Sequence, residues 1–310
     1  MHYPEHFYAA LLASQPLGFY SPQSLLADAR LHGINILPID VCWSDLSASV
    51  QEFSAHQAQG DLERMAHVDK HPHLGIRLGL SDISGLGKAA DRIIQARKTH
   101  NFTSVSDLAY RAELSDRHIR YLAGAGTLDS LGVSRREGIW AAQSVAFTGY
   151  RISDYFQPTI PGTAFGVESG ALPEMKSEEK HRADFYFTNT TPFQHPMEFH
   201  RKILERDGVL TIKQASEKTL GNRLRIAGYV THRQRPRTAH GIMFISLEDE
   251  TGMMNIVCSY GLWERYKREL KNNALIIRGI VERCDGAVNF IADGVEMLEV
   301  IIHSNSRDFR

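Results

Sequence analysis

Two glycines flank a leucine directly before a lysine and a predicted helix in SGLGKAADRIIQARK, residues 84–98. Glycine costs backbone entropy, so Gly85 and Gly87 indicate either an ordinary tight turn or a close approach of the backbone to a ligand. N–H groups exposed at such a turn, with Lys88 beside them and a helix behind, would bind an anion such as phosphate. The stretch fits neither a P-loop nor a dinucleotide fingerprint, because required glycines are absent from both patterns.

A second glycine turn follows further along the chain. Gly124 and Gly126 flank an alanine and are again attached to a predicted helix, DRHIRYLA. The repetition indicates a duplicated unit of helix, turn and helix. It favours phosphate binding at both turns, while a plain structural turn stays open as the alternative.

A cationic stretch lies between Lys218 and Leu247, which contains six basic residues and no acid. The formal net charge of the whole chain is −1, so a nearly neutral total conceals a local field to which polyanions respond. Three arginines fall in a predicted loop between two strand-like runs, and Phe244 on the second run offers a face for base stacking. A solvated basic loop is the alternative. The arginines of the predicted contact set are Arg223, Arg225, Arg233, Arg235 and Arg237.

No arrangement of residues for catalysis is apparent in the sequence. The acidic triplet Glu248–Glu250 is explained by a turn, and the chain has no D-x-D pair for two-metal chemistry. The histidines and aspartate of HVDKHPH, residues 67–73, alternate like ligands on one strand face, but a proline interrupts them. Three widely spaced cysteines make neither a zinc pair nor a disulfide framework, as in a reducing cytosol. We therefore predict no catalytic residue, no metal ligand and no cofactor in this chain.

The spacing of apolar residues divides the 310 residues into helical and strand-like parts. A capped helix ends at Gly33, and repeated helix–turn–helix patterns run from 71 to 146. Residues 147–217 include a stretch rich in proline and glycine and predict a linker with one helix. Five strand-like runs follow, with a helix between the third and fourth, which is the element order of an OB-fold barrel.

Four stretches carry a family resemblance: FYAALLASQPLGFYSPQSLLADARLHGINILPIDV, IRLGLSDISGLG, HPMEFHRKIL and RQRPRTAHGIMFISLEDETG. They resemble the C-terminal part of the bacterial error-prone DNA polymerases, the damage-tolerant relatives of the replicative polymerase III alpha subunit. The resemblance spans nearly the whole chain, and its last stretch is the most specific. In that family the end of the fingers is followed by a tandem helix-hairpin-helix and an OB fold, which is the order predicted above.

The resemblance implies a multidomain α+β fold and a role for each part. The implied parts are the end of a helical fingers region at 1–70, a tandem helix-hairpin-helix domain at 71–146, a linker with a helix at 147–217, an OB fold at 218–300 and a tail at 301–310. The residues implied to hold the phosphates of a duplex behind the primer end are Gly85, Leu86, Gly87, Lys88, Gly124 and Gly126. The arginine loop and the barrel face are implied to bind the single-stranded template.

The sequence also departs from this family. The family usually has a small residue where Arg237 stands and a lysine where His240 stands. Its histidinol-phosphatase-like domain and its palm, with the catalytic aspartates and their Mg²⁺, have no counterpart here. We therefore expect a truncated or split chain that binds primer–template and single-stranded DNA in damage-tolerant synthesis without polymerising nucleotides alone.

Two other functions stay open. The chain can be a subunit of a split polymerase completed by a palm-bearing chain, with lesion-bypass proteins as further partners, or a stand-alone single-strand-binding repair accessory. No apolar run is long enough for a membrane span, so we expect a cytoplasmic location. Binding should weaken steeply with salt, and Arg233→Ala and Arg235→Ala should each lower the salt slope by about one.

Overall fold

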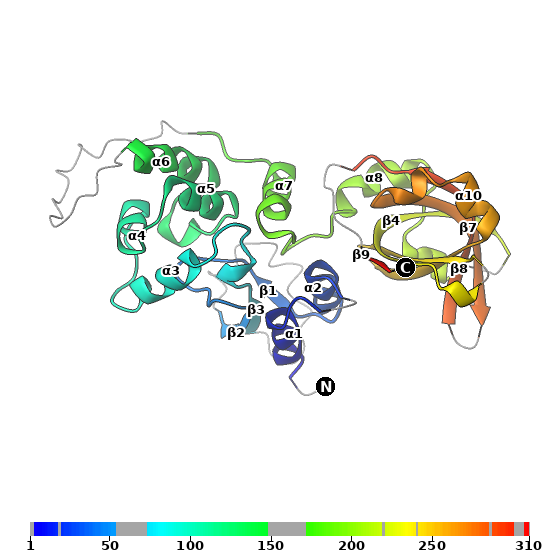
Figure 1. The fold of residues 1–310 in the computed structure, drawn as a ribbon, viewed down its shortest axis with the longest axis horizontal. Coiled ribbons are helices and arrows are strands. Elements are labelled where there is room, and N and C mark those ends of the chain that lie inside the picture. Colours follow the sequence, from blue (N-terminus) through cyan, green and yellow to red (C-terminus); the bar gives the residue numbers. More distant parts are fainter. Residues whose placement is uncertain are drawn as a thin grey trace. The chain divides into compact units, whose positions relative to one another are not determined.

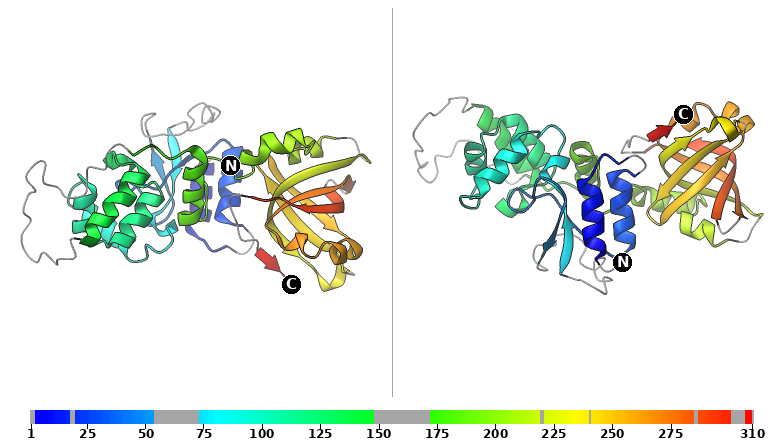
Figure 2. Two further views of the ribbon diagram at one scale, coloured as in Figure 1. Left: turned by 90° about the horizontal axis from the view of Figure 1, so that it is seen from above. Right: turned by 60° about the horizontal axis from the view of Figure 1, so that its bottom comes forward.

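The computed structural model describes residues 3–17, 20–53, 73–147, 172–218, 221–239, 241–284, 287–300 and 307–309. The chain folds into two compact units, which Figures 1 and 2 show from three directions. The first unit comprises Met1–Gln15 and Gly33–Pro192, and the second comprises Pro16–His32 and Phe193–Arg310. The N-terminal segment 1–70 therefore contributes to both units.

The first unit begins with a helix and a small sheet. The sheet has the order β1-β3-β2, with β1 parallel and β2 antiparallel to the central strand β3. Pro38 directly follows β1, and the strand lies at the edge of the sheet, as the missing N–H of proline predicts. The elements are α1 (Pro4–Ala13), β1 (Asn35–Leu37), β2 (Ser49–Glu52) and β3 (Leu74–Arg77).

Five further α-helices follow among the described residues of the first unit (Figure 1). Ser104 and Ser115 cap α4 and α5, since each side chain accepts a hydrogen bond from the amide three residues on. Ile93, Leu108 and Ile119 are fully buried, which confirms the helical spacing of the apolar residues. The helices are α3 (Ala89–Arg97), α4 (Val105–Arg111), α5 (Asp116–Gly124), α6 (Arg135–Phe147) and α7 (Ser177–Thr188).

The second unit is a five-stranded barrel with helices around it. The long first strand β4 pairs with both β5 and β7, so the order β4-β5-β6-β8-β7 closes on itself. β6 and β8 pair in parallel, and α10 lies between the third and fourth strands of the barrel. The predicted OB-fold order is thereby confirmed. The strands are β4 (Arg223–Gln234), β5 (Met243–Asp249), β6 (Gly252–Cys258), β7 (Ala274–Cys284) and β8 (Ala287–Met297), with a short β9 (Arg307–Phe309) beside β4.

The acidic triplet at the end of β5 anchors helices of the second unit. The Asp249 carboxylate accepts a hydrogen bond from the amide of Ile212 at 2.8 Å and one from Arg201 at 3.1 Å. Glu248 accepts a hydrogen bond from the Ser24 hydroxyl at 2.7 Å. The role of the triplet thus goes beyond the turn predicted from sequence. The helices are α2 (Pro22–Leu31), α8 (Glu198–Arg206), α9 (Ile212–Ser216) and α10 (Tyr260–Arg265).

Candidate nucleic-acid interface

The first glycine turn has the backbone geometry that its sequence predicts. Gly85 and Gly87 have φ angles of +79° and +49°, in the left-handed region that favours glycine. A Cβ on Gly85 would lie 2.4 Å from the ring of Tyr121, whereas a Cβ on Gly87 would meet nothing within 4 Å. Gly87 is therefore needed for its backbone conformation, and its surface is open to a ligand.

The amides of this turn are available to an outside acceptor. No described residue accepts a hydrogen bond from the N–H of Gly85, Gly87 or Lys88. These three residues are exposed, and the turn leads into α3, whose N-terminus favours negative charge. Leu86 is only 2% exposed and anchors the turn in the core, so its implied role at the phosphate is indirect. Free amides, a lysine and a helix N-terminus are the components from which proteins build phosphate sites.

The second glycine turn differs from the first, although the sequence predicts two equivalent sites. Gly124 and Gly126 are buried, and the amides of Ala125, Gly126 and Thr127 all donate to carbonyls of α5. This geometry corrects the expectation of a duplicated phosphate site, because the donors at this turn are already used.

Packing explains the glycines of the second turn. A Cβ on Gly124 would lie 2.0 Å from the ring of Phe187, and one on Gly126 would lie 2.6 Å from the Arg135 guanidinium. Arg135 in turn forms a 2.6 Å ion pair with Asp184 of α7. The geometry of Gly124 and Gly126 therefore supports a plain structural turn rather than a phosphate site.

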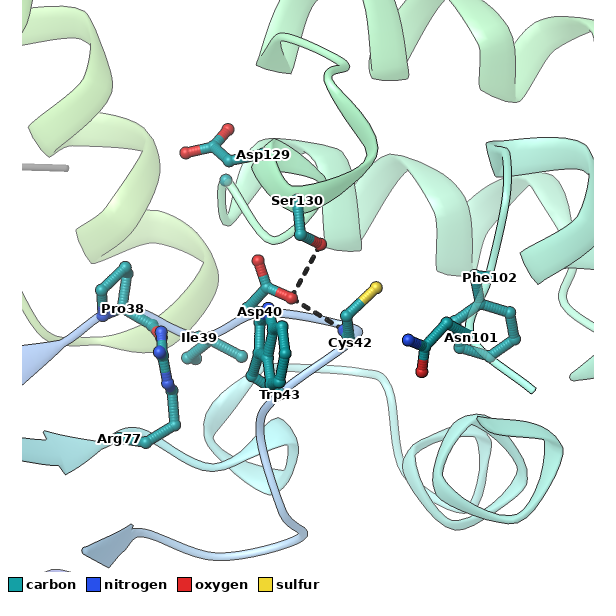
Figure 3. A pocket seen from close by; sticks show the side chains of 11 residues that line it. Pro38, Ile39, Asp40, Cys42, Trp43, Arg77, Asn101, Phe102, Asp129 and Ser130 are labelled. Carbon is teal, nitrogen blue, oxygen red and sulfur yellow. Dashed lines mark hydrogen bonds between the residues drawn. The ribbon is translucent and has the colours of Figure 1, made fainter. Parts of the chain in front are cut away.

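A cavity of about 370 Å³ lies beside the second turn (Figure 3). Asp40 lines it and accepts hydrogen bonds from the Cys42 amide at 2.7 Å and the Ser130 hydroxyl at 2.9 Å. Burial raises the pKa of Asp40 and also that of Asp129, a second carboxyl group on the wall. Two carboxyl groups and one guanidinium, that of Arg77, line the cavity, so its wall does not share the cationic character of the first turn.

Arg233 does not present a free cation. It is 8% exposed, and its Nε donates to the carbonyl of Leu270 at 2.8 Å, while another guanidinium nitrogen donates to Asn272. These carbonyls lie at the short helical turn Glu269–Lys271, which precedes β7. The expectation that Arg233 binds phosphate is therefore corrected: its charge stabilises the barrel.

Arg235 lies on an aromatic platform formed by α10 (Tyr260–Arg265). Its guanidinium carbon is 4.2 Å from the centre of the Trp263 ring and 5.7 Å from that of Tyr260. The Lys267 ammonium is 4.4 Å from the same Trp263 ring. Cations stacked on indole keep their N–H groups available to an anion. Arg237 begins a short helical turn at 237–239, and its side chain lies outside the described part of the structure.

Arg223 and Arg225 are paired with acids on β8. Arg223 contacts Asp293 at 2.7 Å, and Arg225 contacts Glu296 at 2.9 Å. Both arginines stand at the start of β4, whereas Phe244 pairs with Gln234 at its end. A strand advances about 3.3 Å per residue, so roughly 30 Å of strand separates them. Phe244 and these two arginines therefore lie at opposite ends of β4, and both arginines are engaged by acids.

The outer face of β5 and β6 carries Phe244 in a different setting. Phe244 is 37% exposed and lies opposite Val257, and Ser246 lies opposite Asn255 on the same face. Apolar and amide side chains in alternation give a surface for bases rather than for phosphates. Strands two and three of OB folds bind oligonucleotides in this way. The alternation in MNIVCS is the sequence signal that would have found Asn255 and Val257.

Comparisons with known proteins agree with this arrangement. A family model for a helix-hairpin-helix motif matches residues 33–138, and one for an OB-fold nucleic acid binding domain matches residues 224–298. Error-prone DNA polymerases match the chain over its whole length, at 43% identity for Corynebacterium efficiens and 40% for Corynebacterium jeikeium and Mycobacterium tuberculosis. The resemblance to the error-prone DNA polymerases is confirmed. The chain spans only 26–30% of the length of these error-prone polymerases and corresponds to their C-terminal portion.

Other comparisons contribute less. The asparaginyl-tRNA synthetase of Pyrococcus horikoshii aligns with 30% of this chain and 24% of its own at 20% identity, with a TM-score of 0.26, which is too low to support a conclusion. Among the described residues, no helix has both the length and the apolar character needed to span a bilayer. The described residues also hold no group of three or more His, Cys, Asp or Glu side chains placed for a metal ion. Residues 67–72 of the HVDKHPH stretch lie outside the described residues.

Proposed function

We propose that this chain is the DNA-binding C-terminal part of an error-prone DNA polymerase and holds primer–template DNA during damage-tolerant synthesis in the cytoplasm. The observation that carries the proposal is the first glycine turn, whose exposed amides have no acceptor among the described residues. In the second unit, the face with Phe244 and the stacked Arg235 offers a surface for single-stranded template. Nucleotide transfer with its Mg²⁺ is assigned to a palm outside this chain.

The direct test combines a binding assay with an extension assay. Anisotropy of a labelled primer–template should report association that weakens steeply with salt, because phosphate neutralisation releases counterions. The same DNA with excess dNTPs and Mg²⁺ should not be extended by this chain alone. A restored extension on adding a palm-bearing chain would favour a split polymerase. Equal affinity for single strands and primer junctions would favour a single-strand-binding accessory instead.

Lys88→Ala tests the first turn. We expect the slope of log K against log salt to fall in magnitude by about one, because one phosphate contact is lost. Lys98→Ala is the matched control, since Lys98 is an exposed lysine at the opposite end of the same helix α3. Equal slopes for both variants would remove the turn from the interface.

Arg233 and Arg235 are expected to respond differently, in contrast to the sequence-based expectation. Arg233→Ala should lower the free energy of unfolding of the second unit by about 1.5–3 kcal/mol, since charged hydrogen bonds to buried carbonyls are lost. Arg235→Ala should instead reduce the salt slope by about one with little loss of stability. Urea denaturation and anisotropy on both variants separate the two roles. A reduced slope in a stably folded Arg233→Ala variant would contradict the structural role.

A further inference from the structure

A row of aromatic rings leads from the first glycine turn onto α7. Tyr121 covers Gly85, and its ring centre is 5.5 Å from that of Phe187. The ring of Tyr186 stands edge-on to Phe187, with a centre-to-centre distance of 4.9 Å. Tyr186 is the exposed end of this row, with 74% of its surface accessible. Two such ring-to-ring steps keep it within one or two nucleotides of a phosphate held at the turn.

The backbone around Tyr186 is fastened to the same turn. The Ser84 amide donates a 2.7 Å hydrogen bond to the carbonyl of Phe187, the residue next to Tyr186. The buried ion pair of Arg135 with Asp184 fixes α7 from the other side. An aromatic ring on a fixed backbone loses little conformational entropy when a partner stacks on it. The helix-hairpin-helix family model ends at residue 138, so α7 lies outside the matched motif.

Cations flank the row of rings. Lys88 is exposed at the turn itself. The Arg117 guanidinium lies 5.2 Å from the centre of the Tyr121 ring, and its Nε donates to the Tyr121 hydroxyl at 3.2 Å. Both cations therefore belong to the end of the row at Gly85 and Tyr121, and the exposed ring of Tyr186 is at the other end. Cationic grooves with aromatic side chains are the usual combination for single-stranded nucleic acid.

We propose that Tyr186 stacks on an unpaired base of the DNA strand whose phosphate is bound at the first glycine turn. This inference rests on the proposed function. A base within a duplex has both faces covered by its neighbours, so only an unpaired nucleotide offers a face to the ring. The site therefore distinguishes DNA with an unpaired nucleotide beside the bound phosphate from continuous duplex.

The test compares two labelled DNAs with equal numbers of phosphates, one a blunt duplex and one carrying unpaired nucleotides at a junction. Anisotropy with the full chain should show that Tyr186→Ala weakens binding to the junction DNA about fivefold to tenfold. Binding to the blunt duplex should stay within twofold, and the salt slope should not change, because no ionic contact is lost. Tyr186→Phe should bind as the unmodified chain does. Tyr110→Ala, which removes another exposed tyrosine of the same unit, should also bind normally.

Three outcomes would overturn the inference. Tyr186→Ala can bind both DNAs as the unmodified chain does, it can weaken both equally, or it can change the salt slope. Circular dichroism of each variant excludes loss of the fold as the cause, and Tyr186→Leu, which keeps an apolar side chain but has no ring face, provides the readout if Tyr186→Ala does not fold. If the unmodified chain binds neither DNA, the proposed function itself fails. If the unmodified chain binds and Tyr186→Ala binds equally well, only the inference about Tyr186 fails.

Discussion

Replacing Arg135 by methionine is expected to lower the free energy of unfolding of the first unit by about 3–5 kcal/mol. Arg135 makes a 2.6 Å ion pair with Asp184, whose side chain is 5% exposed, and also donates to the carbonyls of Gly124 and Lys180. Without the guanidinium, a buried carboxylate loses its hydrogen-bonded ion-pair partner, and Lys180 and His181 are left as weaker charge partners. Urea denaturation followed by circular dichroism measures the loss.

The loss of stability caused by Arg135→Met should depend on pH. Burial raises the pKa of Asp184, and the nearby Arg135 opposes that rise. Removing Arg135 therefore raises the folded-state pKa further above the unfolded value of about 3.9. A raised carboxyl pKa means that the folded state binds more protons, so stability falls as pH increases through this window. The free energy of unfolding of Arg135→Met should therefore differ less from that of the unmodified chain at pH 5 than at pH 8.

Arg136→Met is the matched control. Arg136 is the next residue of α6 and contacts Glu179 of α7 at 3.0 Å, but both side chains are substantially exposed. An exposed pair contributes little, so the loss should stay within about 0.5 kcal/mol and vary little with pH. If the two variants lose the same stability, Arg135 does not hold α7 in the way the geometry indicates.

Gly279→Ala is expected to destabilise the barrel by about 3 kcal/mol, the upper end of the usual cost of overpacking. A Cβ at this position of β7 would lie 2.1 Å from the carbonyl oxygen of Ile291 on β8 and 2.8 Å from the ring of Phe290. The β7–β8 register shifts between Arg278 and Gly279, which brings the two backbones close at this point. Because the nearest atom belongs to the backbone, the strands themselves must separate. In thermal denaturation, the second unit of this variant should unfold at a lower temperature than that of the unmodified chain.

Gly261→Ala provides the comparison for this substitution. Gly261 lies in α10 of the same unit, and a Cβ there would meet nothing within 4 Å. Alanine favours helix over glycine, so stability should be unchanged or slightly higher. A Gly279→Ala variant as stable as this control would show that the barrel tolerates a side chain where β7 meets β8.

Local signals in the sequence determined the glycine turns, the helices beside them and the barrel strands, but not β2, β3, α7 or α9. The serine caps of α4 and α5, the left-handed glycines of the first turn and the strand alternation that ends the chain each act within a few residues. Such signals need no distant partner, so the glycine turns and the five-stranded barrel could be predicted without the structure. The family resemblance likewise rests on contiguous stretches of sequence, which can be recognised without knowing how the chain folds.

Which of the candidate residues keep donors or surface free of contacts within the chain was decided only by the tertiary structure. The two glycine turns look alike in sequence, yet Phe187 and Arg135, distant along the chain, fill the space beside the second turn, whereas Gly87 of the first turn has open space beside it. From the sequence alone, Arg233 looks like one more basic residue of the predicted loop. In the structure, its guanidinium donates hydrogen bonds to the carbonyls of Leu270 and Asn272. Composition shows how much charge a segment has. Whether that charge remains at the surface depends on burial and on partners that only the folded chain brings together.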